Sequence, residues 1–214
     1  MKHFLLIALT LLSLKFYAQE TDTSWYNKGW ASVELDKYKD AVWYLDRAIA
    51  LNPNYADAYN ERCIAYTGLK KYALALEDIN KAIALNPKDF EYYYNKGVAH
   101  YESNNYFDAL DDYSKALELN PKDADTWCDR GVTKADMNRY TEAIEDYNKA
   151  IELNPKDAVF YENRGNARYY IGQKVEAIDD YKKALQLDPY DKDAKKYLIR
   201  TEKDLERKMI HDNR

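Results

Sequence analysis

The chain has 214 residues, of which 32% are charged and 46% hydrophobic, with 6 Gly, 5 Pro and a formal net charge of −5. This composition is typical of a folded, helix-rich protein and excludes a disordered chain. The acidic balance argues against nucleic acid or an anionic membrane surface as the partner. Tyrosine is unusually frequent, with 22 Tyr against 5 Phe, which favours half-buried contact surfaces because each ring carries a hydroxyl group.

The first residues, MKHFLLIALTLLSLKFYAQE, have the order of a secretory signal peptide. Lys2 precedes an apolar run over residues 4–14, and Ala18 stands before the polar sequence. The run is short of the roughly 20 residues that a membrane-spanning helix needs. We therefore predict that residues 1–18 are a signal peptide cleaved near Ala18, and that the protein is exported to the periplasm or cell envelope. Phe16 is bulky for a cleavage site, so an uncleaved N-terminal membrane anchor is the alternative.

Proline marks a period of 34 residues. The phrase NPKD occurs at 86, 120 and 154, and proline also stands at 53 and 189. The aligned segments are 22–55, 56–89, 90–123, 124–157 and 158–191. An aromatic position in each segment holds Trp25, Tyr59, Tyr93, Trp127 and Tyr161, and a position four residues later holds Gly29, Cys63, Gly97, Gly131 and Gly165. A period of this length indicates an array in which each unit covers the apolar face of the next.

Each segment divides into two helical halves, which in the third are about 90–103 and 107–119. The second half carries Ala109, Tyr113 and Ala116 at i, i+4 and i+7, which is one face of a helix. Asparagine, which tolerates a left-handed backbone, lies between the halves. The comparable turn positions are Asp36, Asn104, Asn138 and Gly172. The segment is therefore predicted to be a helical hairpin.

NPKD is predicted to be the corner between one hairpin and the next. Pro121 cannot continue the helix that ends at Leu119, and Asp123 is placed to cap the following helix. The recurrence of the phrase therefore indicates a structural joint and not a binding motif.

These aromatic, glycine, alanine and proline positions at 34-residue spacing resemble the tetratricopeptide repeat family over residues 22–191. The resemblance implies an all-α, right-handed α-solenoid of antiparallel helix pairs, in which the first helices line a concave groove that binds segments of other proteins. It also implies a protein that is not an enzyme.

Residues 192–214 are predicted to be a C-terminal capping helix and tail. An apolar stripe steps along this charged segment at intervals of three and four residues: Ala194, Leu198, Thr201, Leu205 and Met209. The alternative is that the end of the helix binds a partner or a second copy.

One position departs from the usual apolar pattern of the family and is basic in every segment, holding Lys28, Arg62, Lys96, Arg130 and Arg164. Sixteen residues later stand Asp78, Asp112, Asp146 and Asp180, with Tyr44 in the first segment. This spacing predicts an ion pair inside each hairpin after the first. We interpret the pairs as fixing the register of the two helices and binding nothing.

No catalytic, metal or cofactor site is indicated, because the chain has no HExxH motif, phosphate-binding glycine loop or cluster of Cys and His. His100 is expected to be packed. Cys63 and Cys128 fall two hairpins apart, about 20 Å at roughly 10 Å a layer, so both are predicted to be free thiols. Cys63 takes a packing position and is expected to be inert, whereas Cys128 faces the groove, with a reactive role as the alternative.

The groove residues are assigned from the resemblance, position by position. The partner-binding set is Tyr26, Trp30, Asn60, Ile64, Glu91, Tyr94, Val98, Tyr101, Glu102, Asp125, Cys128, Val132, Asp136, Glu162, Asn166, Tyr169 and Tyr170. The neighbouring groove positions are Thr23, Val33, Glu34, Asp57, Thr67, Gly68, Ala135 and Val159. Seven of these 25 residues are acidic, six are aromatic and none is basic.

An acidic, Tyr-rich groove suits a partner segment that carries Lys or Arg beside apolar side chains. Repeats that clamp the C-terminal carboxylate of chaperones use Lys, Arg and Asn where this chain has Tyr26, Trp30, Tyr94 and Val98, so that activity is excluded. A simpler reading is that acids such as Glu91 and Asp125 only favour the helix dipole.

We predict a non-enzymatic interaction scaffold of the periplasm or cell envelope. The rival is a structural or self-assembling protein that makes contact through its convex face or C-terminal helix, as a homo-oligomer.

Overall fold

The computed structural model describes residues 21–212, and this part of the chain is all-α, with eleven helices and no strand. The helices are α2 Asp22–Val33, α3 Tyr38–Leu51, α4 Ala56–Gly68, α5 Tyr72–Leu85, α6 Phe90–Glu102, α7 Tyr106–Leu119, α8 Ala124–Asp136, α9 Tyr140–Leu153, α10 Ala158–Tyr170, α11 Lys174–Leu187 and α12 Lys192–Asp212. The predicted all-α fold of tandem helix–turn–helix repeats with a terminal helix is confirmed. The signal peptide predicted for residues 1–18 lies outside the described residues.

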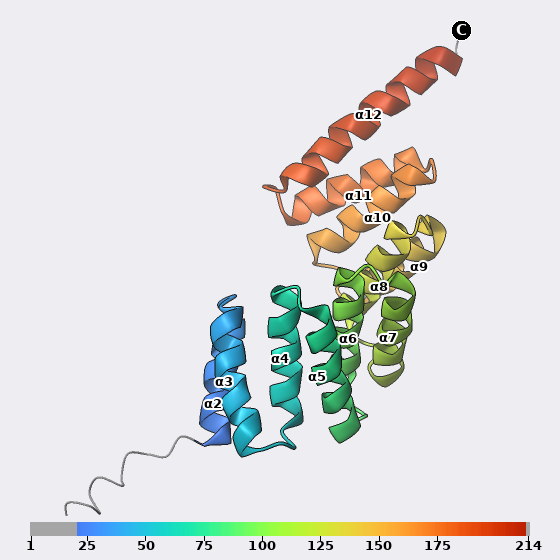
Figure 1. Ribbon diagram of the computed structural model, residues 1–214. Helices are drawn as coiled ribbons and strands as arrows, with labels where there is room; N and C mark the ends of the chain where they lie inside the picture. The colour runs from blue at the N-terminus through green and yellow to red at the C-terminus, as the bar shows by residue number, and fades with distance from the viewer. Residues whose placement is uncertain (1–20, 213–214) are drawn as a thin grey trace, which may run out of the picture. The chain divides into compact units, whose positions relative to one another are not determined.

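The chain divides after Leu85 into two compact units. The first unit holds α2 to α5, and the second holds α6 to α12. In each unit consecutive helices pair as hairpins, α2 with α3 and α4 with α5 in the first, and α6 with α7, α8 with α9 and α10 with α11 in the second (Figure 1). Within a unit each hairpin also packs on the next, so the buried surface continues from hairpin to hairpin.

The turn inside each hairpin contains one residue in the left-handed region. These residues are Asp36, Lys70, Asn104, Asn138 and Gly172, with φ from +55° to +84°. The prediction is confirmed at the four positions that it named. Lys70 was not foreseen, because lysine has little intrinsic preference for this conformation; its amide donates to the carbonyl of Thr67 at 2.8 Å, as the amide of Asn104 does to that of Tyr101.

The corners between hairpins also form as predicted. Asp123 caps α8 by accepting the amide N–H of Thr126 at 2.8 Å. The Asn120 side chain accepts the amide N–H of Lys122 at 3.2 Å and closes the turn before it. The aromatic position adds a bond that the pattern did not reveal, because Trp127 Nε1 donates to the carbonyl of Pro121 at 3.0 Å. Tyrosine hydroxyls make the same bond at three other corners, to the carbonyl groups of Pro53, Pro87 and Pro155.

Small side chains allow the two helices of a hairpin to approach closely. Ala109 and Ala116 of α7 are fully buried. A Cβ atom added to Gly97 of α6 would lie 2.7 Å from the ring of Tyr113, which leaves no room for a side chain there. The repeated glycine, alanine and tyrosine positions therefore form the core of the hairpin.

The predicted ion pairs are present. Arg130 Nη2 lies 2.7 Å from Asp146 Oδ1, and only 4% of the Asp146 side chain is exposed. The equivalent distances are 2.7 Å for Arg62 with Asp78, 3.6 Å for Lys96 with Asp112 and 2.7 Å for Arg164 with Asp180. In the first hairpin, where Tyr44 replaces the acid, Lys28 lies over the ring of Trp25 instead.

Three of these aspartates, Asp112, Asp146 and Asp180, also meet a second basic side chain, one turn further along the first helix. Lys134 Nζ is 2.7 Å from Asp146, and Arg168 Nη1 is 2.7 Å from Asp180. His100 Nδ1 is 2.7 Å from Asp112, so this histidine is packed, as predicted. These second partners were not predicted from the repeat pattern, since they occupy a position that is not basic in every segment.

The arginines also join neighbouring hairpins. Arg130 Nη1 donates to the hydroxyl of Ser114 on α7 at 3.1 Å while its other nitrogens hold Asp146 on α9. Arg164 reaches Asn148 at 2.7 Å, and Arg62 reaches Asp46 at 2.6 Å. One guanidinium thus connects three helices.

We expect Asp146→Ala to lower the free energy of unfolding by about 3 kcal/mol, since the change leaves Arg130 and Lys134 without their shared anion. Urea denaturation followed by far-UV circular dichroism measures the loss. Glu145→Ala, at the exposed neighbouring residue of α9, is the control and should cost less than about 0.5 kcal/mol. Equal effects of the two changes would mean that the ion pair does not hold the hairpin.

Candidate functional site

The first helices of the second unit form a hollow between α6 and α8. Its volume is about 190 Å³, and it is lined by Tyr94, Val98, Tyr101, Glu102, Tyr113, Asp129 and Val132. Five of these residues belong to the predicted groove: Tyr94, Val98, Tyr101, Glu102 and Val132. Asp129 was missed because it stands one position away from the groove positions of the family.

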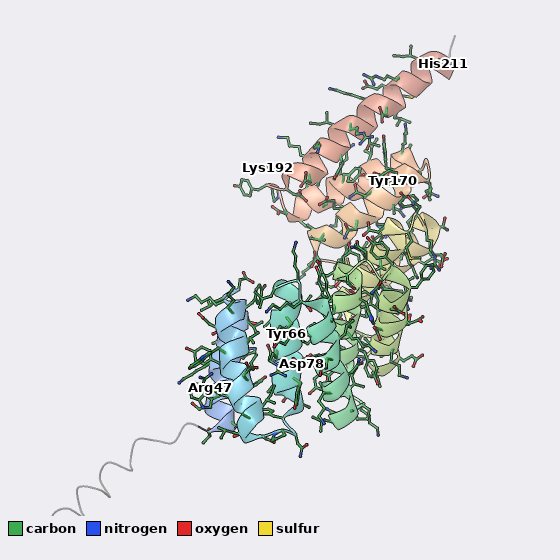
Figure 2. All side chains as sticks on the ribbon, in the orientation of Figure 1. Arg47, Tyr66, Asp78, Tyr170, Lys192 and His211 are labelled. Atoms are coloured by element: carbon green, nitrogen blue, oxygen red, sulfur yellow. The ribbon has the colours of Figure 1, made fainter. Side chains whose placement is uncertain are left out.

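A second hollow, of about 330 Å³, lies between α8 and α10. The predicted residues that line it are Val132, Asp136, Asn166 and Tyr170, together with Ala135 of the neighbouring set. Tyr140, at the start of α9, and Asn163, on α10, also line it and were not predicted. Figure 2 labels Tyr170 on α10.

Tyrosine hydroxyls connect the first helix of one hairpin to the first helix of the next. Tyr94 Oη donates to Asp129 at 2.8 Å, and Tyr101 Oη donates to Asp136 at 2.7 Å. Tyr169 on α10 makes the same bond to Asp204 on α12, also at 2.7 Å. Each pair is 35 residues apart. These tyrosines therefore have a structural role as well as a position on the candidate surface.

Two of the predicted groove residues offer little surface to a partner. Asn60 and Cys128 are each only 5% exposed. Asn163 from the next hairpin lies over Cys128, with Nδ2 at 3.5 Å from Sγ. The position is groove-facing in the family pattern, but the small thiol is covered by the next first helix.

Both cysteines are free and buried, as predicted for free thiols. Burial raises the pKa of Cys63 and of Cys128 to about 12. Since the thiolate is the nucleophilic form, both side chains stay protonated at neutral pH. Burial and the raised pKa both argue against the alternative of a reactive Cys128.

In the first unit the predicted residues lie on α2 and α4. Tyr26 packs against the ring of Tyr55 with centroids 4.9 Å apart. Trp30 is 48% exposed, and Ile64 is half-buried. An exposed indole and a partly buried tyrosine on one helix give this unit an aromatic surface.

Carboxylates gather beside the two hollows. The pKa of Asp129 is raised, first by burial and then by the charges of Asp125 and Asp123, although its bond from Tyr94 acts the other way. The pKa of Asp125 is also raised, by burial and by Asp123 and Asp157. Burial is the main cause of both shifts, and repulsion between the carboxylates adds to it, so a cation placed among them would be stabilised.

Among the carboxyl groups of the candidate surface, Glu162 of α10 has the most strongly raised pKa. Burial raises its pKa to about 7, and a hydrogen bond with Asp191 and the charges of Asp191 and Asp193 add to the shift. A bond from Asn166 opposes it. This carboxyl group therefore changes its charge near neutral pH.

The end of the candidate surface on α12 is basic, which the sequence analysis did not anticipate. Arg200 of α12 lies with Tyr169, Tyr170 and Tyr197 around a small hollow. Its guanidinium carbon is 5.0 Å from the centre of the Tyr169 ring. The absence of basic residues thus holds for the 25 predicted positions and not for the terminal helix.

Over residues 21–212 no group of three or more His, Cys, Asp or Glu side chains could hold a metal ion. In the same range, every helix is too short or too polar to cross a membrane.

We expect stability to fall as the pH rises through the folded-state pKa of Glu162, because this value lies above the ordinary 4.5 and ionisation therefore favours the unfolded chain. Glu162→Gln should make the decrease in the urea midpoint from pH 5 to pH 8 smaller than in the unchanged protein. Glu145→Gln on α9 should leave the decrease unchanged. Identical decreases for Glu162→Gln and the unchanged protein would show that Glu162 titrates normally.

Comparison with known proteins identifies the family. Models described as tetratricopeptide repeat match residues 22–55, 56–89, 90–123, 124–157 and 158–191. A solved structure of the MamA protein is 25% identical, with a TM-score of 0.67, over 79% of this chain and 93% of that chain.

Two further solved structures share the fold. One is YrrB, described as a TPR protein with an unusual peptide-binding site, at 21% identity and a TM-score of 0.64 over 83% of this chain and 91% of that one. The other is PilF of Pseudomonas aeruginosa, at 21% identity and a TM-score of 0.77 over 86% of this chain and 84% of that one. No curated protein matches. Since the matched segments cover most of the sequence, this chain belongs to the tetratricopeptide repeat family.

Proposed function

We propose that the protein is a non-enzymatic scaffold that binds a segment of a partner protein on its first-helix face, and that the segment combines Lys or Arg with apolar side chains. One observation supports this proposal most directly. The residues that line the hollows between α6 and α8 and between α8 and α10 are aromatic, apolar, amide or acidic, and none is Lys or Arg.

The chemistry of the lining supports a cationic segment. Asp129, Glu102 and Asp136 supply negative charge, and Tyr94 and Tyr101 supply ring surface beside it. Cations are attracted both to carboxylates and to the faces of aromatic rings. Val98 and Val132 line the same hollow and suit the apolar side chains of the same segment.

The family supports the proposal in general terms, since the tetratricopeptide repeat is a protein-protein interaction fold. YrrB, which shares the fold, is described as having a peptide-binding site. The choice of partner must then depend on residues that differ between hairpins at one position, such as Tyr26, Asn60, Tyr94, Cys128 and Glu162.

A second candidate function is self-association through α12. This helix has 21 residues, whereas α10 has 13, and its last turns leave Met209 51% and Ile210 58% exposed. Exposed apolar side chains at the end of a long helix could contact a second copy.

We expect Tyr94→Ala and Glu102→Lys to weaken partner capture at least several-fold, because the first removes a ring and the second reverses a charge in the α6–α8 hollow. Mature protein would be crosslinked in envelope extract, and the captured proteins quantified by mass spectrometry. Glu145→Lys, on the exposed side of α9, is the matched charge reversal outside the hollow.

The proposal fails if Tyr94→Ala and Glu102→Lys capture the same proteins as the unchanged chain. If light scattering then shows an oligomer that depends on concentration and that Met209→Ser with Ile210→Ser disrupts, self-association is the function.

We also propose export, which rests on the signal-like residues 1–18. Expression of the full chain in a Gram-negative host should yield a protein that begins near Gln19, as the intact mass would show. A full-length mass in the membrane fraction would instead favour the N-terminal anchor.

A further inference from the structure

The hollow between α8 and α10 contains a stacked pair of tyrosines. The rings of Tyr140 and Tyr170 have centroids 4.8 Å apart and an interplanar angle of 11°. Tyr170 remains 63% exposed. A flat group from a partner can therefore reach the ring of Tyr170 from the open side of the hollow.

Hydrogen-bond acceptors face the same space. Asp136 Oδ2 accepts the hydroxyl of Tyr101, which leaves Oδ1 for another donor. Asn163 uses its Nδ2 toward Cys128, which leaves its carbonyl oxygen. The hollow thus offers one carboxylate oxygen and one amide oxygen beside an aromatic ring.

No basic side chain of these helices fills the hollow. Lys134 of α8 is held by Asp146 at 2.7 Å, and Arg139, which precedes α9, is held by Glu142 at 2.6 Å. Neither belongs to the lining. The negative charge of Asp136 therefore has no ion-pair partner within the described residues.

A guanidinium group matches this arrangement better than an ammonium group. It is planar and stacks on an aromatic ring, and its fork of N–H groups can donate to two oxygens at once. Val132, Ala135 and Ala167 line the rest of the hollow and suit the methylene stem of a long side chain.

We propose that the hollow between α8 and α10 binds an arginine side chain of the partner segment, with Asp136 pairing with the guanidinium group and Tyr170 stacking on it. The inference rests on the proposed function and adds the identity of one recognised side chain. In this site Tyr140 holds the ring of Tyr170 in place by stacking on it. Asn163 supplies the second oxygen that accepts a hydrogen bond from the guanidinium group.

The test uses the mature protein and three probes of the form acetyl-Leu-X-Leu-amide, in which X is arginine, lysine or citrulline. Citrulline has nearly the shape of arginine but no charge. Titrations followed by NMR should show saturable shifts in the Asn163 side-chain amide and the Tyr170 ring. We expect the arginine probe to bind at least threefold more tightly than the lysine probe, with no saturable binding of the citrulline probe.

Asp136→Asn removes the charge and keeps the size of the side chain and an acceptor for Tyr101. It should weaken binding of the arginine probe about tenfold, the scale of one charge-assisted hydrogen bond. Tyr170→Ala should abolish the preference for arginine over lysine. Glu145→Gln, outside the hollow, should change neither, and unchanged circular dichroism of each variant would exclude a loss of folding.

The inference is overturned if the citrulline probe binds as tightly as the arginine probe, if Asp136→Asn leaves binding unchanged, or if the shifts lie away from α8 and α10. Its failure can be separated from that of the proposed function. If a partner crosslinks to the α6–α8 hollow and Asp136→Asn does not change its capture, only the arginine site is refuted. Arginine-selective binding of the probe with no loss of partner capture in Tyr94→Ala and Glu102→Lys would refute only the proposed function.

Discussion

The buried aspartate inside each hairpin after the first is the interaction on which the rest of the structure depends. A carboxylate as enclosed as Asp146, 4% exposed, is costly to bury unless cations hold it, and Arg130 and Lys134 do so from two successive turns of α8. Only one register of α8 against α9 satisfies both contacts. Since Arg130 also donates to Ser114 on α7, the same guanidinium group joins this hairpin to the preceding one. Figure 2 labels the equivalent Asp78 on α5.

Because the ion pairs lie between the two helices of a hairpin, the opposite side of each first helix is free to vary. On that side, hydrogen bonds fix the position of one first helix against the next. Tyr94 donates to Asp129, and Tyr101 donates to Asp136. The bonds hold the hydroxyl groups and leave ring surface at the edge of the hollows. Residues of the proposed binding surface thus also stabilise the contact between hairpins, and the shape of each hollow depends on that contact.

The repeated spacing made much of the fold predictable, since turns, corners and ion pairs such as Arg130 with Asp146 lie within one 34-residue segment and recur with it. The contacts between hairpins were not predicted. Tyr101 and Asp136 are 35 residues apart and meet only once two hairpins are stacked. The burial of Cys128 depends likewise on Asn163 from the next hairpin. The sequence therefore predicted which face of the first helices holds the candidate residues. It did not predict the hydrogen bonds of these residues or how much of each side chain is exposed.

The last described helix, α12, continues the pattern of the first helices. Tyr169 bonds to Asp204 of α12 as Tyr101 bonds to Asp136 of α8, so α12 occupies the place of another first helix. Its Ile199 stands 34 residues after Gly165, where an added Cβ would lie 2.8 Å from Tyr181 of the paired second helix. A residue as large as isoleucine removes the space that a second helix would need. Ile199 is 44% exposed, so among the residues that the structure describes no second helix packs on this face of α12 as Tyr181 packs on Gly165.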